Sequence, residues 1–176
     1  MVEQLPFKEM VLGSTPSGCT MKKEIIVILE NIRSAENVGS VFRSADAFGI
    51  KEVFLVGITA QLNDRFGRPN SKIVKTALGA EKTVPSRHFK TIEEAIAIAK
   101  NDGFQILSLE ISNKSEPIKK VESKEKIALV LGNEVTGVSS EAQTLSEKIV
   151  EIPMQGEKES LNVSVTAGIA MFYFSN

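Results

Sequence analysis

The sequence predicts an α/β fold, with a mostly parallel sheet covered by helices on both faces. Short, nearly continuous apolar runs alternate along the chain with segments whose apolar residues recur at helical spacing. The apolar runs do not alternate with polar residues, which is typical of strands that are buried on both faces of a parallel sheet. At 176 residues, of which 42% are hydrophobic, the chain has the size and composition of one globular domain.

The expected elements follow from local patterns. Short apolar runs that end in polar residues or glycine predict strands at 24–29, 51–56, 104–109, 127–131 and 148–152. Helical spacing predicts helices at 37–48, 91–99 and 162–174, and a shorter one after Ser140. Asn37, Thr91 and Ser140 are the expected N-caps. Residues 59–72 have no period and are expected to form a loop, and the polar stretch 112–126 is expected to be exposed.

Composition excludes several classes of protein. One cysteine (Cys19) and one histidine (His88) exclude an intrachain disulfide and a zinc cluster, so no metal site is expected. The N-terminus has no continuous apolar run, and no segment is long enough to span a membrane, so a cytoplasmic protein is expected. Residues 1–20 show no period and are interpreted as an arm or tail, which leaves residues 21–176 as the domain.

Nucleotide-binding motifs are missing. No Gly-x-Gly occurs, which argues against a dinucleotide-binding enzyme. Residues 13–20 (GSTPSGCT) match the P-loop spacing but carry Cys19 where that loop needs lysine, and no convincing strand precedes them. We interpret this match as accidental and do not expect a P-loop hydrolase.

Charge is distributed unevenly, although the net charge is only −1. Residues 65–90 hold one acidic residue, Glu81, and seven basic ones: Arg65, Arg68, Lys72, Lys75, Lys82, Arg87 and Lys90. On charge alone, this segment is either a solvated face or a contact for the phosphates of a nucleic acid.

Three further segments contain candidate functional residues. In 30–49 (ENIRSAENVGSVFRSADAFG), Arg43 could grip a phosphate or pair with Asp46 at i+3, and spacing favours the ion pair. In 129–139 (LVLGNEVTGVS), Asn133 and Glu134 directly follow a predicted strand, where α/β sheets bind ligands, although a plain turn is the alternative. In 152–172 (IPMQGEKESLNVSVTAGIAMF), the final helix is apolar on both sides, as expected of a core helix or a dimer helix.

Taken together and in order, these three segments resemble the SpoU/TrmH family of RNA ribose 2′-O-methyltransferases, in the SPOUT superfamily. The resemblance covers residues 22–174, and the closing segment IPMQGEKESLNVSVTAGIAMF is its most specific part. It implies a parallel α/β sheet with a C-terminal trefoil knot, S-adenosylmethionine as cofactor and a homodimer. Neither the knot nor the cofactor follows from composition or periodicity.

The resemblance also implies roles for individual residues. The implied catalytic and substrate-orienting residues are Arg43, Asn37, Glu134, Ser160 and Asn162. The implied cofactor-binding residues are Leu131, Gly132, Asn133, Ile152, Met154 and Leu161. An arginine is a poor base because its pKa exceeds about 12, so Arg43 either loses its proton locally or anchors a phosphate.

The implied reaction is 2′-O-methylation of a ribose in structured RNA, with tRNA favoured over rRNA. The sequence departs from the family in Ser34-Ala35-Glu36, where a proline is common, and in lacking the C-terminal extension of some tRNA-specific members. Contact with RNA is therefore expected from the N-terminal arm and from the basic segment, in particular Arg65, Arg68, Lys72 and Lys75. The rival hypothesis is a dimer of the same fold that binds RNA without catalysis.

Overall fold

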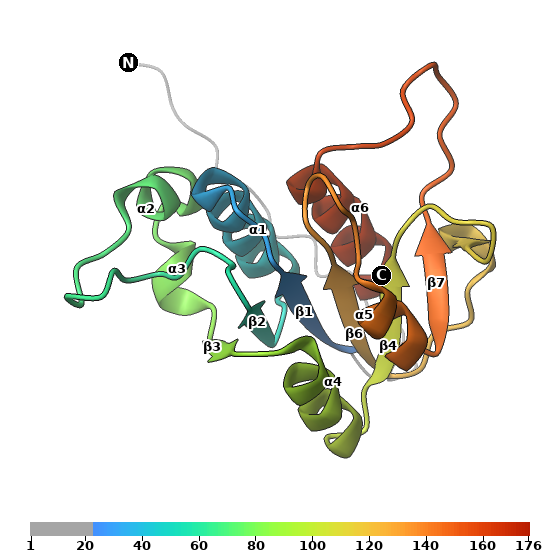
Figure 1. Cartoon of the computed structure of the whole chain (residues 1–176), viewed down its shortest axis with the longest axis horizontal. Helices are drawn as coiled ribbons and strands as arrows, with labels where there is room; N and C mark the ends of the chain where they lie inside the picture. Colours follow the sequence, from blue (N-terminus) through green and yellow to red (C-terminus); the bar gives the residue numbers. More distant parts are fainter. Residues whose placement is uncertain (1–22) are drawn as a thin grey trace, which may run out of the picture.

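The computed structural model describes residues 23–176. The predicted arm at 1–20, with Cys19 and the P-loop-like stretch, lies outside these residues. A seven-stranded sheet, parallel throughout, runs in the order β3-β2-β1-β6-β4-β7-β5 (Figure 1). Its strands are β1 (Glu24–Glu30), β2 (Glu52–Val56), β3 (Ser86–Phe89), β4 (Gln105–Leu109), β5 (Glu116–Pro117), β6 (Lys126–Leu131) and β7 (Lys148–Glu151).

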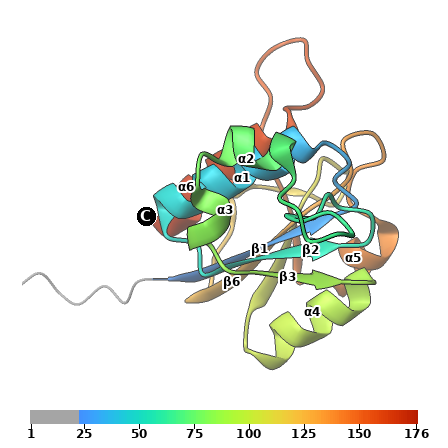
Figure 2. The same cartoon turned by 90° about the vertical axis from the view of Figure 1, so that its left-hand side faces the viewer.

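Helices cover both faces of the sheet, as the sequence predicts. They are α1 (Ala35–Phe48), α2 (Ser71–Ala77), α3 (Ala80–Thr83), α4 (Ile92–Asn101), α5 (Ser140–Leu145) and α6 (Val163–Ser175), with a 3₁₀ turn η1 (Ile118–Lys120). Figure 2 shows α1, α2, α3 and α6 on one face and α4 and α5 on the other. Each face has its own apolar core, with Phe42 and Met171 buried in the first and Phe54 and Ile96 in the second. The predicted fold class is therefore confirmed, and the implied knot stays a prediction.

Two predicted caps are wrong by one to three residues. Helix α1 begins at Ala35, not at Asn37, because the Ser34 hydroxyl is the cap and accepts a hydrogen bond from the Asn37 backbone N–H at 3.1 Å. Likewise Ser139 caps α5 in place of Ser140, accepting from the backbone N–H of Ala142 at 3.1 Å. In both places several residues with capping side chains stand close together, and sequence alone does not say which one leaves the helix.

Short elements were missed between the predicted ones. Helix α2 begins at Ser71, inside the predicted loop 59–72, because Asn70 caps it by accepting from the Lys72 N–H at 3.2 Å. The stretch 112–126 is not uniformly exposed, since Ile118 and Val121 are buried against the first core. A helix of one or two turns, or a two-residue strand, is too short to show a period.

Strand register brings the carboxyl ends of four strands to one level. Leu29 of β1 lies opposite Leu131 of β6, Leu131 lies opposite Leu109 of β4, and Leu109 lies opposite Val150 of β7. The residues that follow these strands therefore emerge side by side at one edge of the sheet. In open α/β sheets this edge is where ligands bind.

Candidate active site

A cavity of about 860 Å³ opens at this edge of the sheet. Its walls come from the ends of β4, β6 and β7, from the loop after β6, and from residues 159–163 before and at the start of α6. The volume lies within the range of sites for small molecules, about 300 to 1,000 Å³. Strand register, together with the start of α6, therefore assembles a site from segments that are far apart in the sequence.

The loop after β6, residues 132–138, folds tightly back on itself. A Cβ atom on Gly132 would lie 2.2 Å from the backbone of Gly137 and Val138, so only glycine fits there. The Asn133 side chain fastens this loop: its Oδ1 accepts from the backbone N–H groups of Val135 at 2.9 Å and Thr136 at 3.2 Å. Its Nδ2 donates to the carbonyl of Asn31 at 2.7 Å, which joins the loop to the end of β1.

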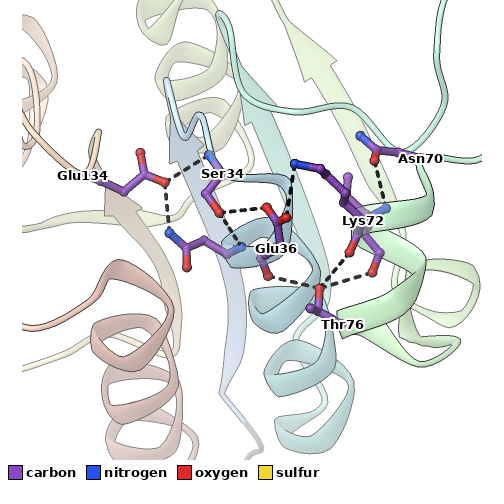
Figure 3. A network of polar contacts seen from close by, with 8 residues as sticks. Ser34, Glu36, Asn70, Lys72, Thr76 and Glu134 are labelled. Carbon is purple, nitrogen blue, oxygen red and sulfur yellow. Dashed lines mark hydrogen bonds and ion pairs between the residues drawn. The ribbon is translucent and has the colours of Figure 1, made fainter.

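Glu134 connects this loop to the start of α1. Its carboxylate accepts hydrogen bonds from the backbone N–H groups of Arg33 and Ser34, each at 3.2 Å, and from Asn37 Nδ2 at 3.0 Å. Figure 3 shows the contact of Glu134 with Ser34. The Asn37 side chain also contacts the third candidate segment, 152–172, because its Oδ1 accepts a hydrogen bond from Asn162 Nδ2 at 3.2 Å. Asn162 in turn caps α6 by accepting from the Ser164 N–H at 2.8 Å. All three sequence segments thus meet at one junction.

Glu134 is ionised at neutral pH. Partial burial raises the pKa of its carboxyl, but the hydrogen bonds from Asn37, Arg33 and Ser34 outweigh burial and leave the pKa below its usual value. Backbone N–H groups at a helix start also favour a negative charge there. The carboxylate therefore orients Asn37 without competing for a proton.

The charge of the cavity is of one sign. Four carboxylates line it, from Glu110, Glu134, Glu151 and Glu159, and no lysine or arginine among residues 23–176 does. Sequence reasoning missed Glu110, whose carboxylate accepts from the N–H groups of Val138 at 2.7 Å and Ile111 at 2.9 Å and so braces the loop after β6 from the opposite side. Its signal was available, because Glu110 is the first residue after a predicted strand, whereas Glu134 is the third residue after one.

The structure brings most of the predicted site residues together. Lining the cavity are Leu131, Gly132, Asn133, Glu134, Ile152, Met154, Ser160, Leu161 and Asn162. Asn37 joins them through its contacts with Glu134 and Asn162. Arg43 does not: it is exposed on α1 and does not line the cavity. The Arg43–Asp46 ion pair that spacing favours is wrong, since no such pair forms among residues 23–176 and Asp46 instead accepts from Thr83 Oγ1 at 2.5 Å.

The four predicted RNA-binding residues are exposed and lie outside the cavity. Lys72 is nevertheless connected to it, because its Nζ pairs with Glu36 at 3.3 Å and Glu36 accepts from the Ser34 hydroxyl at 3.3 Å (Figure 3). Arg65, Arg68 and Lys75 lie on the loop before α2 or on α2 itself. Within residues 23–176, no group of three or more His, Cys, Asp or Glu side chains could hold a metal ion, and no helix has the length and apolar character needed to cross a membrane.

The fold and the site together define a parallel α/β protein with a cavity of small-molecule size at the carboxyl edge of its sheet. The profile of the SpoU rRNA Methylase family matches residues 24–172. The chain belongs to this family.

Individual relatives agree with this assignment. The chain is 37% identical over 86% of its length to an uncharacterized tRNA/rRNA methyltransferase of Borreliella burgdorferi, and it spans 64% of that protein. It is 31% identical over 85% of its length to the tRNA (guanosine(18)-2'-O)-methyltransferase of Thermus thermophilus, of which it spans 73%. The AdoMet-bound structure of an rRNA methyltransferase from Sinorhizobium meliloti superposes with a TM-score of 0.76 at 25% identity, covering 88% of this chain and 56% of that one.

Proposed function

We propose that this protein transfers the methyl group of S-adenosylmethionine to the 2′-hydroxyl of a ribose in structured RNA. The observation that carries the proposal is the junction of Glu134, Asn37 and Asn162 at the rim of the cavity. It places polar groups of fixed orientation beside a site for a small molecule. Family membership supports the same reaction, and relatives named for it include the Thermus thermophilus tRNA enzyme.

The cavity suits a sulfonium compound. In the described part of the chain its charged lining residues are all carboxylates, which disfavour the phosphates of a nucleotide and favour a cation. When bound, S-adenosylmethionine supplies a methyl group that its positively charged sulfur has activated. The residues that would hold it combine apolar walls with backbone of the loop after β6: Leu131, Gly132, Asn133, Ile152, Met154 and Leu161.

The ribose side of the reaction needs positioning and the removal of one proton. We assign positioning to Asn37, Asn162 and Ser160, with Glu134 holding Asn37 in place. Arg43 is the remaining member of the implied catalytic set, either as the group that takes the proton or as a phosphate anchor. Because it lies outside the cavity of its own chain, it would act on RNA bound across α1 or in the site of a second copy.

A homodimer is the second part of the proposal. Four large apolar side chains are exposed on α6: Val165 (47%), Ile169 (39%), Phe172 (59%) and Tyr173 (38%). Such a patch on a helix is typical of a surface that is covered by a partner. Helix α1 packs beside α6, with the rings of Phe48 and Phe172 5.9 Å apart, so the helix that carries Arg43 borders this patch.

We infer tRNA as the favoured substrate and rRNA as the alternative. The relatives include enzymes named for tRNA and for rRNA, so the family itself does not decide between them. The basic residues Arg65, Arg68, Lys72 and Lys75 supply contacts for phosphates, which every structured RNA offers.

The test is the transfer of radiolabelled methyl from S-adenosylmethionine to bulk tRNA and, separately, to rRNA, with nucleoside analysis of the product. A 2′-O-methylated nucleoside from one pool is expected, and it identifies the substrate class. Arg43→Ala is expected to abolish transfer while leaving cofactor affinity unchanged. Cofactor binding without transfer to either pool would contradict the enzyme proposal and favour the RNA-binding dimer.

A further inference from the structure

The loop between β2 and α2 carries an exposed aromatic ring at its turn. Phe66 is 66% exposed, and the guanidinium carbons of Arg65 and Arg68 lie 4.7 Å and 5.2 Å from the centre of its ring. We call residues 63–69 the Phe66 loop; it belongs to the segment that projects at the left of Figure 1, between β2 and α2. A single exposed apolar side chain is ordinary, so its surroundings decide whether it has a role.

The Phe66 loop is held in one shape by its own contacts. The carboxylate of Asp64 accepts hydrogen bonds from the backbone N–H groups of Phe66 at 2.8 Å and Arg68 at 3.0 Å, and from Arg68 Nε at 2.8 Å. A β-bridge between Asn63 and Pro69 closes the base of the loop. The backbone that carries the ring is therefore held in place, although the ring itself belongs to neither apolar core of residues 23–176.

The loop is also connected to the candidate active site. Asn70, which directly follows it, donates from its backbone N–H to the carbonyl of Leu62 at 2.8 Å and caps α2. Helix α2 then reaches the first turn of α1 through the ion pair of Lys72 with Glu36 and through the hydrogen bond from Thr76 Oγ1 to the Glu36 carbonyl at 3.1 Å (Figure 3). The first turn of α1 is thus connected both to the Phe66 loop, through α2, and to the junction of Glu134, Asn37 and Asn162.

We propose that the Phe66 loop is a stacking platform for an unpaired base of the RNA substrate; this rests on the proposed function for RNA as the ligand. Aromatic rings and guanidinium planes are the surfaces on which proteins stack splayed bases. The charges fit a nucleic acid: Arg65 pairs with no carboxylate within residues 23–176 and is available to a phosphate, whereas Asp64 engages Arg68. Single-stranded elements of the RNA, not its helices, are the part recognised here.

The first test measures binding of the full chain to two labelled RNAs, a single strand of about 12 nucleotides and a blunt duplex of the same sequence. Phe66→Ala is expected to weaken single-strand binding by about 5- to 150-fold and to leave duplex binding unchanged. Phe66→Trp is expected to retain wild-type affinity because its ring also stacks. An unchanged single-strand affinity for Phe66→Ala would overturn the proposal, and it is also the result expected if the loop contacts a protein and not RNA. An equally large loss of single-strand affinity for Phe66→Trp would overturn the proposal too.

Two controls separate stacking from charge and from general loss of apolar surface. Leu78→Ala removes an equally exposed apolar side chain (67%) at the end of α2 and is expected to change neither affinity. Arg65→Ala is expected to reduce the salt dependence of binding by about one phosphate contact, whereas Phe66→Ala leaves this dependence as it is. A salt dependence that falls equally in both variants would contradict a stacking role for Phe66.

Methyl transfer supplies an independent readout. If the wild-type chain methylates tRNA or rRNA, Phe66→Ala is expected to raise KM for that RNA and to leave kcat unchanged, because the platform binds ground state and transition state alike. Absence of transfer by the wild-type chain would count against the proposed function alone, since the binding experiment needs no reaction. A lower kcat at unchanged KM would overturn the platform.

Discussion

Replacing Glu134 by glutamine tests the junction on which the proposed site depends. Glutamine keeps the shape of the side chain but loses its charge. Its amide oxygen still accepts hydrogen bonds, whereas its NH2 group, in place of the second carboxylate oxygen, leaves the N–H group that it faces without an acceptor. Three hydrogen bonds to the carboxylate are affected, from Arg33, Ser34 and Asn37. A hydrogen bond to a buried charged group contributes about 1.5 to 3 kcal/mol, but Glu134 is exposed and solvent screens it. We therefore expect a total loss of about 1 to 2 kcal/mol.

Thermal unfolding and methyl transfer measure the two consequences of Glu134→Gln. A loss of this size lowers Tm by about 3 to 6 °C in a domain of this length. Because the variant weakens the hydrogen bond that orients Asn37 and, through it, Asn162, we expect kcat/KM for RNA to fall by about 100-fold with little change in cofactor affinity. Glu93→Gln is the matched control, since the Glu93 carboxylate, on α4 across the sheet, has no hydrogen-bond or ion-pair partner within residues 23–176. A full loss of cofactor binding at unchanged Tm would refute the assigned role.

The loss of stability caused by Glu134→Gln depends on pH in a defined direction. The pKa of Glu134 is lowered in the folded protein, so its contribution to stability is present above the pKa of the unfolded side chain, about 4.3. That contribution is lost as the pH falls through the lower folded pKa. The difference in Tm between wild type and Glu134→Gln should therefore be largest at neutral pH and shrink in acid, and a difference that grows in acid would contradict the sign of the shift.

Three further variants test the loop, the core and the dimer. Gly132→Ala is expected to lower the free energy of unfolding by about 1 to 3 kcal/mol and to abolish cofactor binding measured by calorimetry. Gly156→Ala, with nothing within 4 Å of the new Cβ, should change neither the stability nor the cofactor binding. Thr59→Val leaves the buried N–H of Ile32 without the hydroxyl that accepts from it at 3.1 Å, so denaturant unfolding should show a loss of about 1 to 3 kcal/mol; an unchanged midpoint would refute this. Phe172→Asp is expected to yield a monomer by light scattering, and a persistent dimer would contradict the α6 interface.

The sequence was sufficient for five of the seven strands, all except the short β3 and β5, because burial on both faces gives a strand a nearly continuous apolar run. Strands such as Ile25–Leu29 and Ile127–Leu131 are continuous apolar runs, and their residues are buried as expected. The strand order could not be derived, because β1 pairs with β6 across about a hundred residues of chain. Nothing local to either strand encodes that pairing.

The candidate site, like the sheet, could be predicted from the sequence only in part. Glu134 could be singled out because an acidic residue lies just beyond the carboxyl end of a strand, and the same rule, applied consistently, would have found Glu110. The contact of Asn37 with Glu134 and Asn162 was not visible in the sequence, since these residues stand 97 and 125 positions apart. The ion-pair interpretation of Arg43 failed because an i+3 spacing permits a contact without requiring it, and Thr83 from a neighbouring helix engages Asp46 instead.

The first turn of α1 contacts both the proposed RNA platform and the proposed catalytic junction, so the two sites can act together. On one side, Ser34 and Asn37 donate to Glu134 at the cavity. On the other, Glu36 holds Lys72 of the helix that follows the Phe66 loop. Transfer of a methyl group to a hydroxyl depends on in-line placement of the reacting atoms. A rigid turn that contacts both the loop and the cavity lets an RNA held at a distance present its ribose at a fixed position relative to the cofactor.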